Sequence, residues 1–131
     1  MRTRISKNYV GRGTAGRKEV SLRINKSGLS ADGKQRFVVA VRFTADAAKK
    51  ASGSGYVAVE IDDETNRLYF VTASPSDGYK LIVSSKNGSA KSITFAVGCI
   101  DEWEALVGEY DLKKDVSDNS YYIDIAICPT V

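Results

Sequence analysis

The stretch YVAVEIDDETNRLYFVT, residues 56 to 72, decides the fold. Its two flanks, YVAVEID and RLYFVT, alternate apolar with polar side chains, which is the period of a β-strand with one buried face. The four residues between the flanks, DETN, are polar and suited to a turn. The stretch therefore predicts a β-hairpin with one apolar face.

The same alternation continues in both directions along the chain. A turn is predicted at Asp32-Gly33, and Asn87-Gly88 predicts a type I′ turn between two further strands. Residues 111–120 are polar and are predicted to form a loop. The remaining predicted strands cover residues 19–25, 36–43, 79–85, 90–97 and 121–127.

Two short helices interrupt this β pattern. Thr44 can cap a helix over residues 45–51, and Asp46 lies in its first turn, where the helix dipole favours negative charge. Residues 100–107 place their apolar side chains on one helical face and end at Gly108. About seven strands and two helices predict a mainly β, β-rich α+β protein with an antiparallel barrel or sandwich. At 131 residues it is expected to form a single domain.

The segment GRGTAG, residues 11 to 16, carries the G-x-G-x-x-G spacing of a dinucleotide-binding turn. That turn requires the last glycine to open a helix whose N-terminal amides receive the pyrophosphate. Here the alternating segment 19–25 follows, so a strand is expected instead. We interpret the glycines as a loop between two hairpin arms, or between a flexible arm and a strand.

The composition favours a binding protein over an enzyme. The chain has no histidine and two cysteines, so the commonest general base is missing and no structural zinc site or cofactor is predicted. A Ser/Lys or carboxylate catalytic site stays open. Cys99 and Cys128 lie in apolar surroundings and are interpreted as buried free thiols. Neither end shows a signal peptide or membrane span, so a soluble protein of the cytoplasm is expected.

Charge is distributed unevenly along the chain. Residues 1–50 hold 13 Lys/Arg against 3 Asp/Glu, whereas residues 51–131 hold 6 against 13. Such asymmetry is typical of proteins that bind nucleic acid or another polyanion; the alternative is that the two halves neutralise each other in the fold. The basic, glycine-containing N-terminal arm, about residues 1–27, is the predicted contact segment. Its candidate nucleic-acid-binding residues are Arg2, Arg4, Lys7, Tyr9, Arg12, Arg17, Lys18, Arg23 and Lys26.

The segment VRFTADAAKKASGSGYVAVEIDDETNRLYF, residues 41–70, resembles the AbrB-type swapped-hairpin domain and small phage-encoded β-rich proteins. The resemblance implies an interleaved homodimer, or a higher homo-oligomer, and DNA binding through basic residues. The sequence departs from that pattern at SGSG before Tyr56 and in its acidic hairpin, so a DNA contact is predicted at the basic arm instead.

Two functional hypotheses follow. In the first, the protein is a non-enzymatic phage or bacterial regulator in the bacterial host cell that contacts nucleic acid through the basic arm. In the second, it is a phage anti-defence inhibitor that binds a host defence protein or sequesters an anionic nucleotide signal, because an acidic face can mimic phosphates and a basic pocket can hold them.

Overall fold

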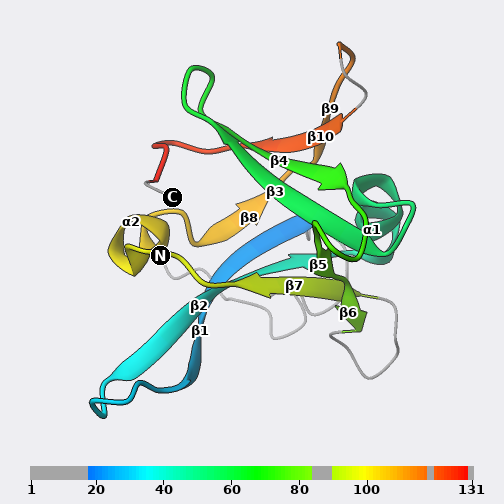
Figure 1. Ribbon diagram of the computed structural model, residues 1–131. Helices are drawn as coiled ribbons and strands as arrows, with labels where there is room; N and C mark the ends of the chain where they lie inside the picture. Colours follow the sequence, from blue (N-terminus) through cyan, green and yellow to red (C-terminus); the bar gives the residue numbers. More distant parts are fainter. Residues whose placement is uncertain (1–17, 84–89, 118–119, 130–131) are drawn as a thin grey trace, which may run out of the picture.

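The computed structural model describes residues 18–83, 90–117 and 120–129. Two five-stranded antiparallel sheets pack face to face, and two short helices cover their ends (Figure 1). Sheet A has the order β6 (Ile82–Val83), β7 (Lys91–Phe95), β2 (Gln35–Phe43), β1 (Val20–Leu29) and β8 (Gly108–Tyr110). Sheet B has the order β5 (Tyr79–Lys80), β3 (Tyr56–Asp62), β4 (Arg67–Thr72), β10 (Ser120–Asp124) and β9 (Lys113–Asp115). The predicted β-rich fold with two helices is confirmed.

The hairpin predicted over residues 56–72 forms β3 and β4, with Val57 opposite Thr72 and Asp62 opposite Arg67. Its turn is closed by the Asp62 carboxylate, which accepts a hydrogen bond from the Glu64 backbone N–H at 2.9 Å. The inward side chains of the hairpin are buried within the same chain: Val57 and Leu68 are fully covered. A single chain therefore covers this apolar face, and the interleaved dimer stays a prediction.

The core lies between the two sheets. Strand alternation turns one side of each strand inward, and the covered side chains are mostly branched aliphatic or aromatic. Phe43 of β2 and Phe70 of β4 meet edge to face across the sheets, with ring centroids 5.0 Å apart. The largest fully buried side chains are Trp103, Phe43, Phe70, Leu22, Leu68, Ile93, Leu106, Ile123, Val20, Val39, Val41 and Val57.

Helix α1 (Ala45–Ala51) follows β2 as predicted, and the Thr44 side chain accepts a hydrogen bond from the Ala47 backbone N–H at 3.3 Å. Helix α2 (Ile100–Glu104) is shorter than the predicted 100–107, because the chain turns after Trp103 to enter β8. Each helix buries one side against the sheets. None of the helices in the described ranges is long and apolar enough to cross a membrane.

The chain passes from one sheet to the other at two corners that the sequence pattern did not predict. The predicted strand 79–85 is wrong as one element, because it breaks at buried Leu81 into β5 of sheet B and β6 of sheet A. The predicted loop 111–120 is wrong at its centre, because Leu112 is buried there and β9 follows it. The described part of the chain thus holds ten strands rather than about seven.

The β1–β2 hairpin is longer than predicted and projects beyond the two sheets (Figure 1). Its last pair over the core is Ile24 opposite Val39, and the ladder continues through Lys26 opposite Phe37 to Leu29 opposite Gln35. Apart from half-buried Ser30, every residue from 25 to 37 is exposed. We call residues 25–37 the hairpin arm.

Candidate functional site

The outer face of sheet A, turned away from sheet B, carries three arginines on the β1–β2 hairpin. Val39, Val41 and Phe43 of β2 point inward, so Arg36 and Arg42 of the same strand point outward. Leu22 of β1 also points inward, and its neighbour Arg23 therefore joins them. We call Arg23, Arg36 and Arg42 the arginine face. Since a strand rises about 3.3 Å per residue, Arg36 and Arg42 are roughly 20 Å apart along β2.

A surface cavity of about 450 Å³ lies at the base of this face. Arg23 and Arg42 form part of its wall, and Lys18, Ser21 and Thr44 add an ammonium group and two hydroxyls. Ser21 lies directly opposite Arg42 in the ladder, which places both side chains at the same level of the sheet. The cavity therefore offers cationic and hydroxyl donors from two strands and the start of α1.

Three carboxylates also line the cavity, and two of them have described partners. Glu19 forms an ion pair with Lys50 at 3.3 Å, and Glu109 accepts a hydrogen bond from the Lys18 backbone N–H at 3.3 Å. The third, Asp46, lies in the first turn of α1. None of the three lies within ion-pair distance of Arg23 or Arg42 in the described ranges.

Arg42 is the most informative residue of the site. Its side chain is half-buried, yet within the described ranges it has no ion pair and no side-chain hydrogen bond. Arg23 lies diagonally across the ladder from Arg42 in the wall of the same cavity and carries the same charge. An anion bridging the two side chains would accept hydrogen bonds from both guanidinium groups.

The predicted basic residues are only partly within the described structure. Arg2, Arg4, Lys7, Tyr9, Arg12 and Arg17 lie outside the described residues, as do the three glycines of GRGTAG. Lys18 forms a long ion pair with Asp111 at 3.8 Å, between exposed groups, which contributes little. Arg23 lies in the cavity wall, and Lys26 lies farther along β1 on the arm. The segment after the glycines is a strand, as expected.

Arg42 and Arg36 were missed as site residues by the sequence reasoning, although the signal was present. The strand predicted over 36–43 has inward Val39, Val41 and Phe43, and the same alternation places both arginines on its other face. The alternation within each strand does not give the register between β1 and β2. The pairing of Ser21 with Arg42 is what brings Arg23 and Arg42 into the wall of one cavity. Cys99 was also misjudged: it is exposed, whereas Cys128 is half-buried, and both thiols are free.

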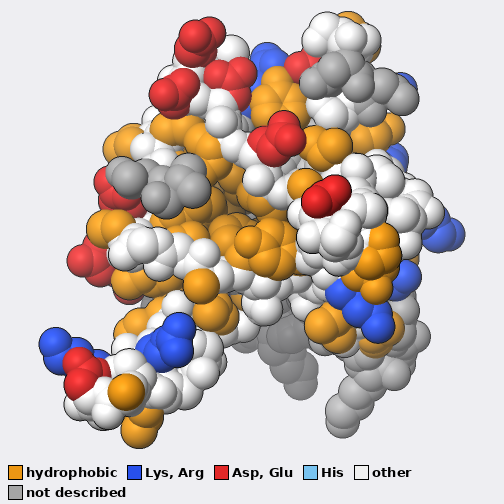
Figure 2. Space-filling view, in the orientation of Figure 1, with side chains coloured by type: hydrophobic (Ala, Val, Ile, Leu, Met, Phe, Trp, Pro, Cys, Tyr) orange, Lys and Arg blue, Asp and Glu red, His pale blue; other side chains and the backbone are white. Residues whose placement is uncertain are grey.

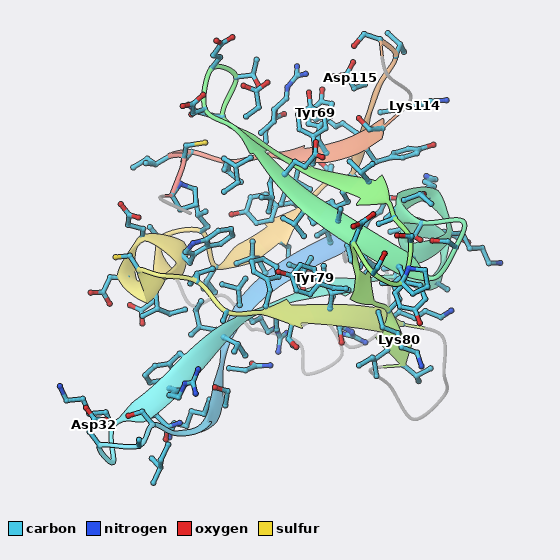
Figure 3. All side chains as sticks on the ribbon, in the orientation of Figure 1. Asp32, Tyr69, Tyr79, Lys80, Lys114 and Asp115 are labelled. Carbon is cyan, nitrogen blue, oxygen red and sulfur yellow. The ribbon has the colours of Figure 1, made fainter. Side chains whose placement is uncertain are left out.

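A second polar cluster lies on the outer face of sheet B, and its charged groups pair with one another. The Tyr69 hydroxyl accepts from Arg67 at 3.2 Å and donates to Asp115 at 2.7 Å, and the Arg67 guanidinium lies 4.1 Å from the Tyr122 ring centroid (Figure 3). Hydrogen bonds from Ser117 and Tyr69 lower the pKa of Asp115 to about 2. The cluster links β4, β10 and β9, and we interpret it as structural.

This cluster predicts an acid-dependent loss of stability. Because the pKa of Asp115 is about 2 in the folded chain and about 3.8 when unperturbed, its stabilising effect is present above pH 4 and is lost as the pH falls towards 2. Urea unfolding at pH 5 should show Asp115→Asn to be less stable than the wild type, and the gap should narrow by pH 2.5 and close below pH 2. Asp63→Asn, in the exposed β3–β4 turn, is the control. A gap that is unchanged at low pH would contradict the prediction.

Charge is separated across the surface. Acidic side chains gather at the end of the β3–β4 hairpin and over α2, whereas the hairpin arm carries lysine and arginine (Figure 2). Asp62, Asp63 and Glu64 do not form a metal site, since no cluster suited to a metal ion occurs in the described ranges. Among the described ion pairs, Lys18 with Asp111 at 3.8 Å joins the basic half of the chain to the acidic half, whereas Lys50 with Glu19 lies within the basic half.

The chain matches no model of a protein family, no curated protein and no solved structure at a significant level.

Proposed function

We propose that the protein binds nucleic acid, and that the arginine face together with the cationic segment leading into β1 contacts the phosphate backbone. The observation that supports this most directly is Arg42, a half-buried residue with no ion pair in the described ranges, which shares one cavity wall with Arg23. Guanidinium groups bind phosphate through two parallel N–H donors, so two arginines on adjacent strands suit a phosphate oxygen array.

The sequence leading into this face strengthens the electrostatic argument. Residues 1–26 hold 8 Lys/Arg against Glu19 as the one acidic residue, and Glu19 is already paired with Lys50. Each phosphate contact releases a condensed counterion, so affinity for duplex DNA should fall steeply with salt. The proposed role is therefore non-enzymatic binding, with phosphate contacts that position the protein.

A salt titration with a matched pair of variants tests the proposal. Fluorescence anisotropy with a labelled 24-base-pair duplex and its single strand should show binding at 50 mM salt that weakens strongly by 200 mM. Arg23→Gln/Arg42→Gln should bind about tenfold or more weakly at low salt, and its salt slope should be shallower by about 1.8, since each lost phosphate contact contributes about 0.9.

The control removes two charges elsewhere. Lys80→Gln/Lys114→Gln changes two exposed lysines on β5 and β9, which lie away from the hairpin arm (Figure 3). It should retain most of the affinity and the wild-type slope. No detectable binding of the wild type at 50 mM salt, or equal losses in the two double variants, would contradict the proposal.

The shape of the site favours one second candidate, capture of a small anionic nucleotide. A cavity of about 450 Å³ falls in the size range of small-molecule sites, and Thr44 and Ser21 could donate to a phosphate held by the arginines. Native mass spectrometry of the purified protein separates the two: a discrete nucleotide mass favours capture, and heterogeneous nucleic acid favours the first proposal. Inhibition of a host protein stays a prediction.

A further inference from the structure

The hairpin arm presents exposed apolar side chains and cations on the same rigid ribbon. Leu29 is 66% exposed and Phe37 is 41% exposed, although large apolar groups are usually covered. The arm also carries Lys26, Lys34 and Arg36, against Asp32 as its one carboxylate. Figure 3 shows Asp32 at the far tip of the arm, well away from the two sheets.

The single carboxylate of the arm is engaged inside the turn. Asp32 accepts hydrogen bonds from the Ser30 hydroxyl and from the Lys34 backbone N–H, and these bonds lower its pKa, the Ser30 bond most. The negative charge of Asp32 is thus stabilised by hydrogen-bond donors within the turn. The three cations have no ion pair in the described ranges, so the arm is free to meet a negatively charged partner.

The arm is held in shape by its own hydrogen bonds. Ser30 N–H donates to Lys34 O at 2.8 Å, and Gly33 N–H donates to Ser30 O at 2.9 Å. The Gln35 amide spans the irregular part of the ladder, donating to Gly28 O at 2.8 Å. Gly28 and Gly33 have φ of 106° and 84°, a backbone conformation that glycine adopts without strain. Such an arm loses little conformational freedom on binding.

Cations on both faces of the ribbon suit a groove with a phosphate strand on each wall. Lys26 lies opposite Phe37 in the ladder, so both side chains share one face. Arg36, the next residue along, lies on the other face with Arg42. A ribbon of two strands and its side chains is about 10 Å thick, which fits the roughly 12 Å major groove of B-form DNA and not the roughly 6 Å minor groove.

We propose that the hairpin arm enters the major groove of B-form duplex DNA, with Lys26, Lys34 and Arg36 on the flanking phosphates and Leu29 at the tip against base edges. The inference rests on the proposed function and specifies that the nucleic acid is duplex DNA and that the arm lies in its major groove. Leu29 would contact the apolar thymine methyl groups that the major groove displays. Arg23 and Arg42, at the base of the same hairpin, then meet the adjoining backbone. Duplex RNA is excluded by its deep, narrow major groove.

The test compares one sequence as duplex DNA, duplex RNA and single-stranded DNA. We expect the wild type to bind duplex DNA at least tenfold more tightly than duplex RNA. Lys26→Gln/Lys34→Gln and, separately, Leu29→Ser should each remove most of that preference, whereas Lys80→Gln/Lys114→Gln should keep it. Since all substituted side chains are exposed, circular dichroism should show wild-type folding in every variant.

Competition by groove ligands identifies the groove. Methyl green, which occupies the major groove, should displace the protein, and distamycin, which occupies the minor groove, should not. If duplex DNA is bound but the arm variants behave like the control, or distamycin displaces the protein, the arm inference is overturned while the proposed function stands. If the wild type binds no nucleic acid, both are overturned.

Discussion

Phe43→Ala should lower the free energy of unfolding by about 3–5 kcal/mol, the range for deleting a buried phenyl ring. Phe43 is fully buried at the end of β2, and its ring meets Phe70 of sheet B edge to face, with an angle of 86° between the ring planes. The substitution thus removes burial, an aromatic pair and a contact between the two sheets. Since domains of this size are stable by about 5–15 kcal/mol, the variant should lose a large share of its stability.

Phe37→Ala is the matched control for this prediction. Phe37 lies on the same face of the same strand, six residues earlier, but it belongs to the hairpin arm and is 41% exposed. Its removal should lower the free energy of unfolding clearly less than Phe43→Ala does, because Phe37 is already 41% exposed and no enclosed cavity forms. Urea unfolding followed by circular dichroism measures both. Equal losses in the two variants would contradict the described core.

The contrast between these two phenylalanines shows what the sequence could and could not predict. Alternation correctly places Phe37 and Phe43 on one face of a strand, because side-chain direction is a local property. Whether that face is covered depends on where the opposing sheet ends, which is a property of the whole fold. The arm was therefore predicted as an ordinary hairpin, and its projection appears only in the structure.

The break within the strand predicted over residues 79–85 could not be predicted for a related reason. Around Leu81, the apolar run Leu81-Ile82-Val83 is typical of a strand, and nothing local indicates that the chain changes sheets there. The Leu81 N–H donates to Gly55 O at 2.9 Å, so a bond to a distant segment fixes the corner. By contrast, α1 and the β3–β4 hairpin were predicted with their correct bounds, because a cap and a polar turn are encoded within a few residues.

The candidate site was predictable in its charge and not in its geometry. Residue counts alone indicate a cationic N-terminal half, and Arg23 belongs to both the predicted arm and the cavity wall. Arg42 comes from a different predicted strand, and its partial burial and its lack of an ion pair among the described residues appear only in the folded chain. The site is therefore shared between two strands, and no contiguous motif could have specified it.

Trp103→Ala should lower the free energy of unfolding by a similar amount, about 3–5 kcal/mol, and should release α2 from the sheets. Trp103 is 2% exposed and meets Phe95 of β7 edge to face, with ring centroids 5.4 Å apart. A helix of five residues is not stable by itself in water, so α2 depends on the packing of Trp103 against the sheets. Amide hydrogen exchange should accelerate across residues 100–104 well beyond the change in the core strands.

Trp103→Phe separates packing from hydrogen bonding at this position. The indole N–H of Trp103 is buried and has no hydrogen-bond partner in the described ranges, so replacing the indole by a phenyl ring loses contact area and no described hydrogen bond. Phenylalanine should therefore retain most of the stability that alanine loses, and protection of α2 should persist. Because Trp103 is the one tryptophan, both variants require circular dichroism in place of intrinsic fluorescence. An equal loss with phenylalanine and alanine would show that the indole N–H makes a stabilising hydrogen bond.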